Sequence, residues 1–358
     1  MDHKFSFPNR PLDLICGGRV TVDLYSQQIG SSIEASQSFA KYLGGSTGNI
    51  AVGSARLGLN SSMLARVGDE AFGRFIRQTL KTEGVDTSHL ITDPHHLTGL
   101  TFLEISPPNH FPLLFYRESC ADLQLKRTDA DDEYLRRAKA FLFNGTCLSK
   151  EAMQTEIVEI AKRAKVLGAK IIFDIDYRSS FWETNKSAEG NAYQTSNVDL
   201  SLSYRKILGF VDLIVGTEEE FFIASGENIL DSALSYFRSK TAAVLIVKKG
   251  AQGCEIYPGS LDEPIVGEPY PVTVLNAIGA GDAFMCGLLY SWFRNKTWQE
   301  CARTANASGA IVVMRHGCAP AMPTSEELEY FLEAKQKDPT FESDKTLEAL
   351  HSKIGNRL

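Results

Sequence analysis

Residues 276–288 combine flexible and reactive residues, because a Gly279-Ala280-Gly281 turn leads into Asp282 and an apolar run. Small residues let backbone amides converge on an anion, and the positive end of a helix adds to that attraction. Such a turn can hold a phosphoryl group. Because a carboxylate beside bound phosphate repels it, Asp282 makes best sense as the acceptor of a proton from an alcohol that attacks the phosphate.

Two other interpretations of this turn stay open. Asp282 can simply cap a helix, since acids in the first turn interact favourably with the helix dipole. A dinucleotide-binding turn fits less well. Its glycines follow the first strand of a βαβ unit, whereas this turn lies near the end of the chain.

The composition favours one large globular domain. The chain has 358 residues, 43% of them hydrophobic, which is enough for a sizeable core. The net charge is −7 and no basic run is interleaved with aromatic residues, so we expect no nucleic-acid partner. The seven cysteines are scattered and form no C-x-x-C pair, which indicates reduced, buried thiols. The histidines do not cluster, so no zinc site is predicted.

The first residues lack the apolar region of a signal peptide, and no stretch approaches the length needed to cross a bilayer. We therefore expect a cytoplasmic protein without a membrane partner.

Apolar runs alternate with helical patterns along much of the chain. A strand at 12–16, a helix at 49–57, a strand at 62–67 and a helix at 70–82 follow one another in βαβα order. The pattern resumes with a strand at 140–144, a helix at 152–167, and strands at 171–175, 213–215 and 244–248; a further helical run covers 300–314. Continuous apolar strands are typical of a sheet covered on both faces. The predicted fold is α/β, a doubly wound and mostly parallel sheet flanked by helices.

Two segments, about 20–42 and 97–120, break this rhythm. The second contains paired apolar runs around Pro107-Pro108-Asn109, as in a β-hairpin. We expect both segments to form a small β lid over the carboxyl ends of the core strands, where open α/β sheets bind ligands. The lid and the core together would make one domain over residues 1–334. Residues 335–358 are charged and would form a surface helix or tail.

Two strings of the sequence match a known family in order. Gly-Gly-Ser-Thr-Gly-Asn at 44–49 and Gly-Ala-Gly-Asp at 279–282 resemble the two signatures of the ribokinase-like carbohydrate kinases. The resemblance spans about residues 11–330. Within the family, the chain looks most like members that act on 5-dehydro-2-deoxygluconate in myo-inositol breakdown. The strings that carry this likeness are GRVTVDLY at 18–25, FAKYLGG at 39–45, FYRESCAD at 115–122, DIDYR at 174–178 and GTEEE at 216–220.

The resemblance implies transfer of the γ-phosphate of Mg²⁺-bound ATP to a primary hydroxyl of a sugar acid. Asp282 would be the general base. The amides of Gly279, Ala280 and Gly281 would stabilise charge on the transferred group.

The resemblance also implies a set of substrate-binding residues: Asp23, Gly44, Gly45, Asn49, Arg117 and Arg178. Asp23 would accept hydrogen bonds from sugar hydroxyls, although turn formation is the ordinary role of an aspartate there. Arg117 and Arg178 indicate an acidic substrate, because guanidinium binds carboxylate bidentately. Either arginine could instead pair with a nearby Glu118 or Asp176, and Arg178 could face the transferred phosphate.

For the nucleotide, the resemblance implies contacts from Lys248, from the backbone of Gly250 and Gly253, and from Asn306. Lys248 ends an apolar strand and could equally be solvated. Asn306 lies in a helical run, where a polar residue is unremarkable.

Two departures from the family pattern concern ions. Glu219 corresponds to the acid that organises magnesium and its waters, but Gly216 replaces the usual asparagine of that element, and Glu218 and Glu220 flank it. The turn at 279–282 follows Asn-Ala-Ile instead of the aspartate and threonine of many relatives, so dependence on a monovalent cation stays open.

The leading hypothesis is an ATP-dependent kinase that phosphorylates the 6-hydroxyl of 5-dehydro-2-deoxygluconate. The alternatives are a 2-dehydro-3-deoxygluconate kinase or another ribokinase-like sugar kinase. A hypothesis from a different class is a non-catalytic module that binds a sugar or nucleotide for regulation. Relatives often pair through their lids, so a homodimer is plausible.

Overall fold

A computed structural model describes residues 7–107, 110–182 and 198–355 of the chain. The main sheet has nine strands in the order β13-β12-β11-β10-β9-β8-β1-β4-β5. The parallel strands are β1 (Leu12–Gly17), β4 (Ser61–Gly68), β5 (Leu90–Asp93), β8 (Ala138–Asn144), β9 (Lys170–Asp174), β10 (Leu213–Thr217) and β11 (Val244–Lys248). The short strands β12 (Cys254–Tyr257) and β13 (Ile265–Gly267) extend one edge in antiparallel pairing.

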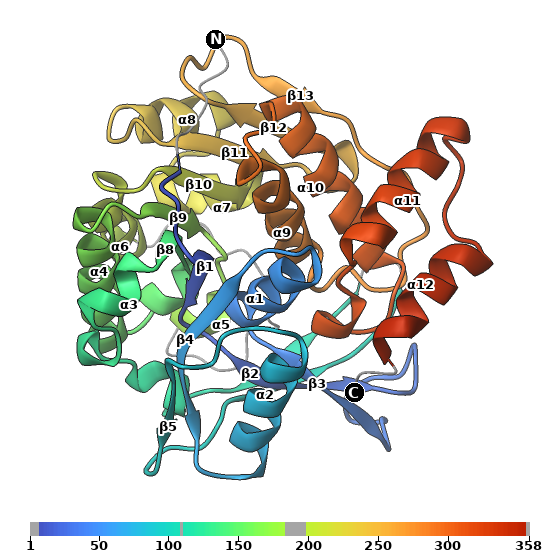
Figure 1. Ribbon diagram of the computed structural model, residues 1–358, viewed down its shortest axis with the longest axis horizontal. Coiled ribbons are helices and arrows are strands. Elements are labelled where there is room, and N and C mark those ends of the chain that lie inside the picture. Colours follow the sequence, from blue (N-terminus) through green and yellow to red (C-terminus); the bar gives the residue numbers. More distant parts are fainter. Residues whose placement is uncertain (1–6, 108–109, 183–197, 356–358) are drawn as a thin grey trace.

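Helices cover both faces of this sheet, as the sequence predicts for a doubly wound fold (Figure 1). One layer consists of α1 (Ser46–Arg56), α2 (Ala71–Thr82), α9 (Ala280–Trp292) and α10 (Trp298–Val313). The other consists of α3 (Asp132–Arg136), α4 (Glu151–Val166), α6 (Val198–Leu208), α7 (Glu218–Ser225) and α8 (Leu230–Arg238). The side chains of β1 alternate between the two layers, because Leu14 and Cys16 join one hydrophobic cluster and Ile15 joins the other.

A second sheet of four strands has the order β3-β2-β6-β7. It is built from β2 (Thr21–Ser26), β3 (Phe39–Gly44), β6 (Leu100–Leu103) and β7 (Leu113–Tyr116), which come from the two segments that break the βα rhythm. The hairpin β6–β7 is antiparallel, as predicted, whereas β2 and β6 pair in parallel. Of the turn expected at 107–109, residues 108–109 lie outside the described part of the chain.

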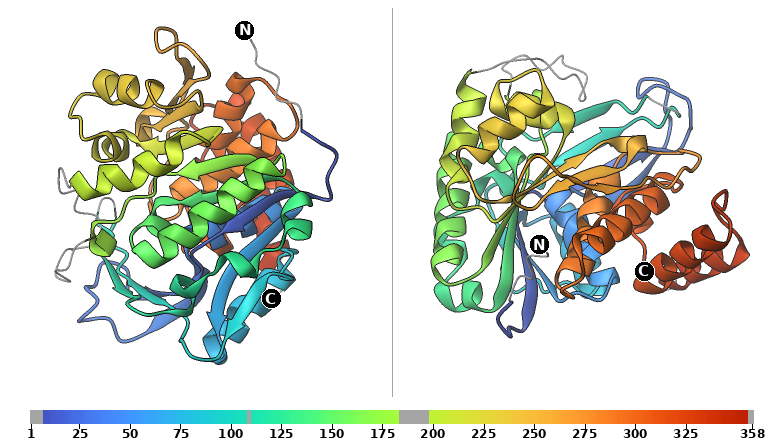
Figure 2. Two further views of the ribbon diagram at one scale, coloured as in Figure 1. Left: turned by 90° about the vertical axis from the view of Figure 1, so that its left-hand side faces the viewer. Right: turned by 90° about the horizontal axis from the view of Figure 1, so that it is seen from above.

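The last helices, α11 (Ser325–Lys337) and α12 (Lys345–Gly355), lie at the periphery, outside α9 and α10 (Figure 2). The boundary expected at residue 335 falls inside α11. Helix α12 is anchored rather than loose, because Leu347 is buried and His351 Nδ1 lies 3.0 Å from the Glu327 carboxylate.

The strand order reverses at β1, because the chain continues to β4 and β5 on one side of it and to β8, β9, β10 and β11 on the other. In open α/β sheets, ligands bind outside the carboxyl ends of the strands at such a switch point. Gly18 makes the bend from β1 into the second sheet with φ of 128°, and a Cβ there would meet Cys147 Sγ at 2.3 Å. The second sheet therefore starts directly at this switch point.

Candidate active site

Asp282 lies in the first turn of α9, beside the start of α1. Its Oδ1 accepts a 2.7 Å hydrogen bond from Ser46 Oγ, and its Oδ2 accepts a 2.8 Å bond from Asn49 Nδ2. Gly279 provides the N-cap of α9 with a left-handed φ of 89°. The side chain of Asp282 is only partly covered. A ligand can therefore reach a carboxylate whose direction is fixed by two donors.

Burial raises the pKa of Asp282, and the negative charge of Asp176 adds to the rise. Hydrogen bonds from Asn49 and Ser46 oppose it, because they stabilise the ionised form. A raised pKa makes the carboxylate a better proton acceptor. This environment suits a general base more than a plain helix cap.

Asp23 lies on β2, in the second sheet, with its carboxylate directly over Gly44. A Cβ on Gly44 would lie 2.0 Å from the Asp23 side chain, so only glycine fits there. Burial raises the pKa of Asp23 to about 6 against the attraction of Arg19. Gly45 is equally constrained, since its φ is 85° and a Cβ would lie 2.6 Å from the carbonyl oxygen of Arg19. The two glycines thus bring α1 close to Asp23.

Lys248 supplies positive charge next to the Gly279–Gly281 turn. Its Nζ lies 3.3 Å from the position that a Cβ on Gly281 would occupy. It also forms an ion pair of 3.2 Å with Asp174 Oδ1 and lies 3.9 Å from Glu220 Oε2. Burial alone would lower the pKa of Lys248, but these two carboxylates raise it, so the ammonium stays charged. Lys248 and the turn of Gly279–Gly281 together form a positively charged site beside Asp282.

Arg178 follows β9 and joins the same polar cluster. Its Nη2 lies 3.0 Å from Asp176 Oδ1, and its Nη1 donates to the Tyr177 carbonyl oxygen and lies 4.0 Å from Glu220 Oε1. Asp176 has a left-handed φ of 33° and accepts a 2.8 Å hydrogen bond from Asn144 Nδ2. Backbone strain of this kind persists where surrounding contacts hold it, often at functional sites.

Arg117 ends up deep inside the protein. Its Nε donates to Asp122 Oδ2 at 2.7 Å, and both side chains are 1% exposed. The guanidinium carbon lies 5.0 Å from the centre of the Phe181 ring. The two arginines that the sequence singles out therefore lie in different environments.

The structure brings together the residues of the proposed nucleotide turn. Gly253 has φ of 86°, and a Cβ there would lie 2.1 Å from the carbonyl oxygen of Gly267. Asn306 Nδ2 donates to that same oxygen and to the carbonyl oxygen of Glu268, at 2.9 Å each. Gly250 is exposed with φ of 56°. Asn306 thus holds the backbone behind this turn.

Glu219 is exposed, whereas its neighbour Glu220 is buried and turns toward Lys248. Glu220 accepts hydrogen bonds from the backbone amides of Tyr177 and Thr217. The part of the chain that the structure describes contains no group of three side chains able to cage a metal. These acids fit Mg²⁺ that reaches the site with nucleotide phosphates and keeps its waters.

Ser46 and Arg19 contribute to this site without having been identified from the sequence. Asp176 was named only as a partner for Arg178, which it is, and Glu220 only as a neighbour of Glu219. Ser46 stands inside the glycine-rich string at 44–49, so its spacing from Asn49 was an available signal. The roles of Arg19, Asp176 and Glu220 depend on which strand ends become neighbours, and no local pattern reveals that.

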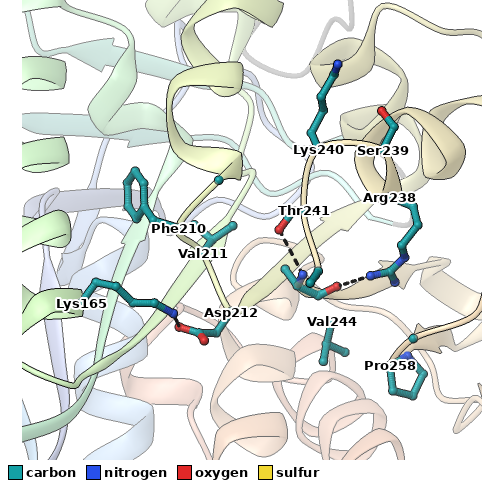
Figure 3. A pocket seen from close by; sticks show the side chains of 14 residues that line it. Lys165, Phe210, Val211, Asp212, Arg238, Ser239, Lys240, Thr241, Val244 and Pro258 are labelled. Atoms are coloured by element: carbon teal, nitrogen blue, oxygen red, sulfur yellow. Dashed lines mark hydrogen bonds and ion pairs between the residues drawn. The ribbon is translucent and has the colours of Figure 1, made fainter.

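A separate cavity of about 1000 Å³ opens at the other end of the sheet, before the first residues of β10 and β11. Lys165 and Asp212 form an ion pair of 2.6 Å on its wall, and Arg238 donates to the carbonyl oxygen of Ala243 (Figure 3). These polar groups are occupied by partners within the fold. Because Asp282 and Lys248 lie at the carboxyl ends of the strands, this cavity is not part of their site.

Residues 12–325 match the family described as pfkB family carbohydrate kinase. The chain belongs to this family of carbohydrate kinases. A relative from Geobacillus kaustophilus, named 5-dehydro-2-deoxygluconokinase, is 34% identical over 330 residues, which cover 90% of this chain and 94% of the relative.

Solved structures show the same fold as this pfkB kinase. A fructokinase from Xylella fastidiosa with bound ATP superposes with a TM-score of 0.78 at 22% identity, and it covers 90% of this chain and 99% of its own. An E. coli structure titled as a ribokinase II, in complex with ATP and Mg²⁺, has a TM-score of 0.79 at 23% identity, with the same coverage. In the described part of the kinase, no helix is long and apolar enough to span a membrane.

Proposed function

We propose that this kinase transfers the γ-phosphate of Mg²⁺-bound ATP to the 6-hydroxyl of 5-dehydro-2-deoxygluconate. The observation that carries the proposal is Asp282, held by Ser46 and Asn49 in the first turn of α9, within the part of the chain that matches the carbohydrate kinase family. The substrate is taken from the relative of that name, with which the chain is collinear over 94% of the relative's length.

In this proposal Asp282 accepts the proton of the 6-hydroxyl as its oxygen attacks the phosphorus. Asp23 accepts hydrogen bonds from other hydroxyls of the acceptor, and Asn49 contributes its Oδ1, which is buried without a hydrogen-bond partner. The narrow approach over Gly44 and Gly45 lets backbone atoms contact the sugar. Holding the hydroxyl in line with the phosphate supplies much of the rate enhancement.

The amides of Gly279, Ala280 and Gly281 and the ammonium of Lys248 would stabilise negative charge on the transferred group. Arg178 stands beside them, paired with Asp176. We assign the nucleotide to the turn of Gly250 and Gly253, with Asn306 supporting it through the carbonyl oxygens that it binds.

Mg²⁺ would neutralise phosphate charge. Asp174 and Glu220 are the buried carboxylates beside Lys248 that can bind its water molecules, and Glu219 is the exposed carboxylate on the same helix turn.

A substitution of Asp282 by Asn tests the mechanism. We expect kcat to fall by about 10²–10⁴-fold, because an amide cannot accept the proton, while ATP and the acceptor still bind. The matched control is Asp231→Asn, an exposed acid in the first turn of α8. Unchanged turnover in Asp282→Asn would contradict the mechanism, and the loss of acceptor binding would point to a positioning role instead.

A panel of acceptors under Mg²⁺-bound ATP tests the substrate. We expect the highest kcat/KM for 5-dehydro-2-deoxygluconate among it, 2-dehydro-3-deoxygluconate and neutral ketohexoses. A several-fold preference for 2-dehydro-3-deoxygluconate would replace the substrate and keep the chemistry. Ligand binding without phosphoryl transfer to any acceptor would favour a regulatory binding module.

The kinase also presents a surface suited to a second copy. On the edge strand β7, Leu114 is 41% and Tyr116 is 59% exposed, and both point to the same face of the second sheet. Exposed apolar side chains on an unpaired strand edge are common at interfaces. We therefore include a homodimer through this sheet in the proposal.

A further inference from the structure

Arg19 is fixed at the bend where β1 leads into the second sheet. Its carbonyl oxygen accepts a 2.7 Å hydrogen bond from Thr47 Oγ1, on the same first turn of α1 that holds Asp282. Gly18 and Gly45 enclose this bend, and neither position has room for a side chain. The backbone of Arg19 is therefore fixed relative to the first turn of α1, which also binds Asp282.

The guanidinium of Arg19 lacks the partners that its burial calls for. Its side chain is 7% exposed, and its ion pair with Asp176 Oδ2 is long, at 3.6 Å. Its Nε is buried without a hydrogen-bond partner. An unsatisfied donor on a buried charged group is costly, so it calls for an explanation, and a bound molecule that completes it is one.

Arg117 shares this situation and lies near the same aromatic ring. The guanidinium carbons of Arg19 and Arg117 lie 5.5 and 5.0 Å from the centre of the Phe181 ring. The Nε of Arg117 donates to Asp122, but its Nη2 is buried and has no hydrogen-bond acceptor among the described residues. Two guanidinium groups, each with a buried donor that has no hydrogen-bond partner among the described residues, thus lie near Phe181.

This pair borders the acceptor end of the site. Phe115 of β7 contacts Phe181 with ring centres 4.5 Å apart. In the second sheet, Phe115 pairs with Thr101, and Thr101 pairs with Asp23. Phe115 is therefore two strand pairings from Asp23, and the charge of Arg19 acts on the Asp23 carboxylate directly.

Charge explains why an acidic acceptor needs Arg19. Asp23, Asp176 and Asp282 would all repel an incoming carboxylate. Burial raises the pKa of Asp23 and Asp282 and the positive charge of Arg19 opposes that rise, while Arg178 and then Arg19 lower the pKa of Asp176 against its burial. Arg178, by contrast, is paired with Asp176 at 3.0 Å and with the Tyr177 carbonyl oxygen at 2.8 Å, beside the positively charged site at Lys248.

We propose that Arg19, assisted by Arg117, binds the carboxylate of the acceptor and sets the preference for sugar acids over neutral sugars. The inference rests on the proposed function only in that the acceptor is an acid. In this arrangement Arg178 lies near the transferred phosphate and does not bind the carboxylate.

The test compares two ligands that differ only at C1: D-gluconate, which carries a carboxylate, and D-glucitol, which carries an alcohol. We measure their dissociation constants by calorimetry for wild type and Arg19→Gln, together with kcat/KM for 5-dehydro-2-deoxygluconate. We expect wild type to prefer gluconate and Arg19→Gln to lose about 10- to 100-fold in gluconate affinity, with glucitol affinity unchanged. The loss in kcat/KM should appear mainly in KM.

Two further variants control for the change in net charge and for loss of folding. Arg127→Gln removes an exposed guanidinium paired with Glu156, so it makes the same change in net charge and should leave the preference intact. Arg19→Lys keeps the charge opposite Asp176 and should recover part of the gluconate affinity; it carries the test if thermal melting shows that Arg19→Gln does not fold.

Each outcome decides the inference. A wild type that prefers gluconate beside an Arg19 variant that keeps the preference would overturn it and leave the kinase assignment standing. A wild type that binds both ligands equally, or neither, would also overturn it. In a further outcome, Arg19→Gln loses the preference for gluconate while the wild type phosphorylates a different sugar acid. That result would support the role of Arg19 and refute the proposed substrate.

Discussion

Three carboxylates of the site, the buried Asp23 and Asp176 and the half-buried Asp282, differ in how the cost of their ionisation is offset. Asp282 receives two side-chain hydrogen bonds, and Asp176 receives one hydrogen bond from Asn144 and the attraction of Arg178 and Arg19. Asp23 has less compensation, so burial dominates and raises its pKa to about 6. Folding therefore disfavours the ionised form of Asp23.

Substitution of Asp23 by Asn should stabilise the protein at alkaline pH. Because the folded-state pKa is raised above the ordinary 3.8, protonated Asp23 contributes stability that is fully present below about pH 4 and lost as pH rises through 6. A shift of this size corresponds to at most about 3 kcal/mol. Urea unfolding at pH 8 should show Asp23→Asn more stable than wild type, with a smaller difference at pH 5.

The exposed Asp262→Asn is the control, and its effect should not depend on pH over this range. The same Asp23→Asn protein should bind the acceptor more weakly, because it loses a charged hydrogen-bond acceptor. If Asp23→Asn is destabilised equally at both pH values, the carboxylate is better satisfied in solution than these contacts indicate.

At the scale of elements, local patterns predicted most of the parallel strands and their flanking helices within a few residues, because continuous apolar runs and helical spacing are local signals. Short edge strands such as β12 and β13 were not predicted, since their place depends on pairing with β11. The same limit applies to the site. Asp23 and Asp282 stand in recognisable motifs. Arg19 and Asp176, by contrast, meet only because β1 and β9 end at the same edge of the sheet, separated by the single strand β8.

The glycine before α9 is expected to be indispensable for the geometry of Asp282. In Gly279→Ala, the Cβ would lie 2.7 Å from Cys318 Sγ and the residue would keep a φ of 89°. A left-handed alanine alone costs about 1–2 kcal/mol. We therefore expect a loss of about 2–4 kcal/mol in the free energy of unfolding, together with a loss of turnover.

Gly226→Ala separates the two causes, because Gly226 has φ of 82° but open space around its Cβ position. It should lose only the conformational part, about 1–2 kcal/mol. Equal losses in both variants would mean that Cys318 moves aside without cost.

At the scale of the whole molecule, the nine-stranded sheet supplies a rigid frame while the second sheet carries Asp23 on its inner face and Leu114 and Tyr116 on the other. In strands, neighbouring positions alternate between faces, so one hairpin can serve the site and a partner at once. The proposed sugar contact and the proposed dimer interface therefore share the same four strands.

Light scattering should report a dimer for wild type and a monomer for the double variant Leu114→Asp and Tyr116→Asp, because two charges would be buried without partners. Val166→Asp is the control, since Val166 is 86% exposed at the end of α4, which is not part of the second sheet. A wild-type monomer at high concentration would contradict the pairing.

The hydrogen bonds that orient Asp282 join residues 236 and 233 positions apart in the chain. During synthesis, α1 leaves the ribosome long before α9 exists, so the apolar surface that α9 will cover stays open, including the backbone of Ile50 that Cys286 later contacts. A product ended by an early stop codon would lack both its reactive acid and this cover. Such a fragment would be inert and a natural target for chaperones and proteases.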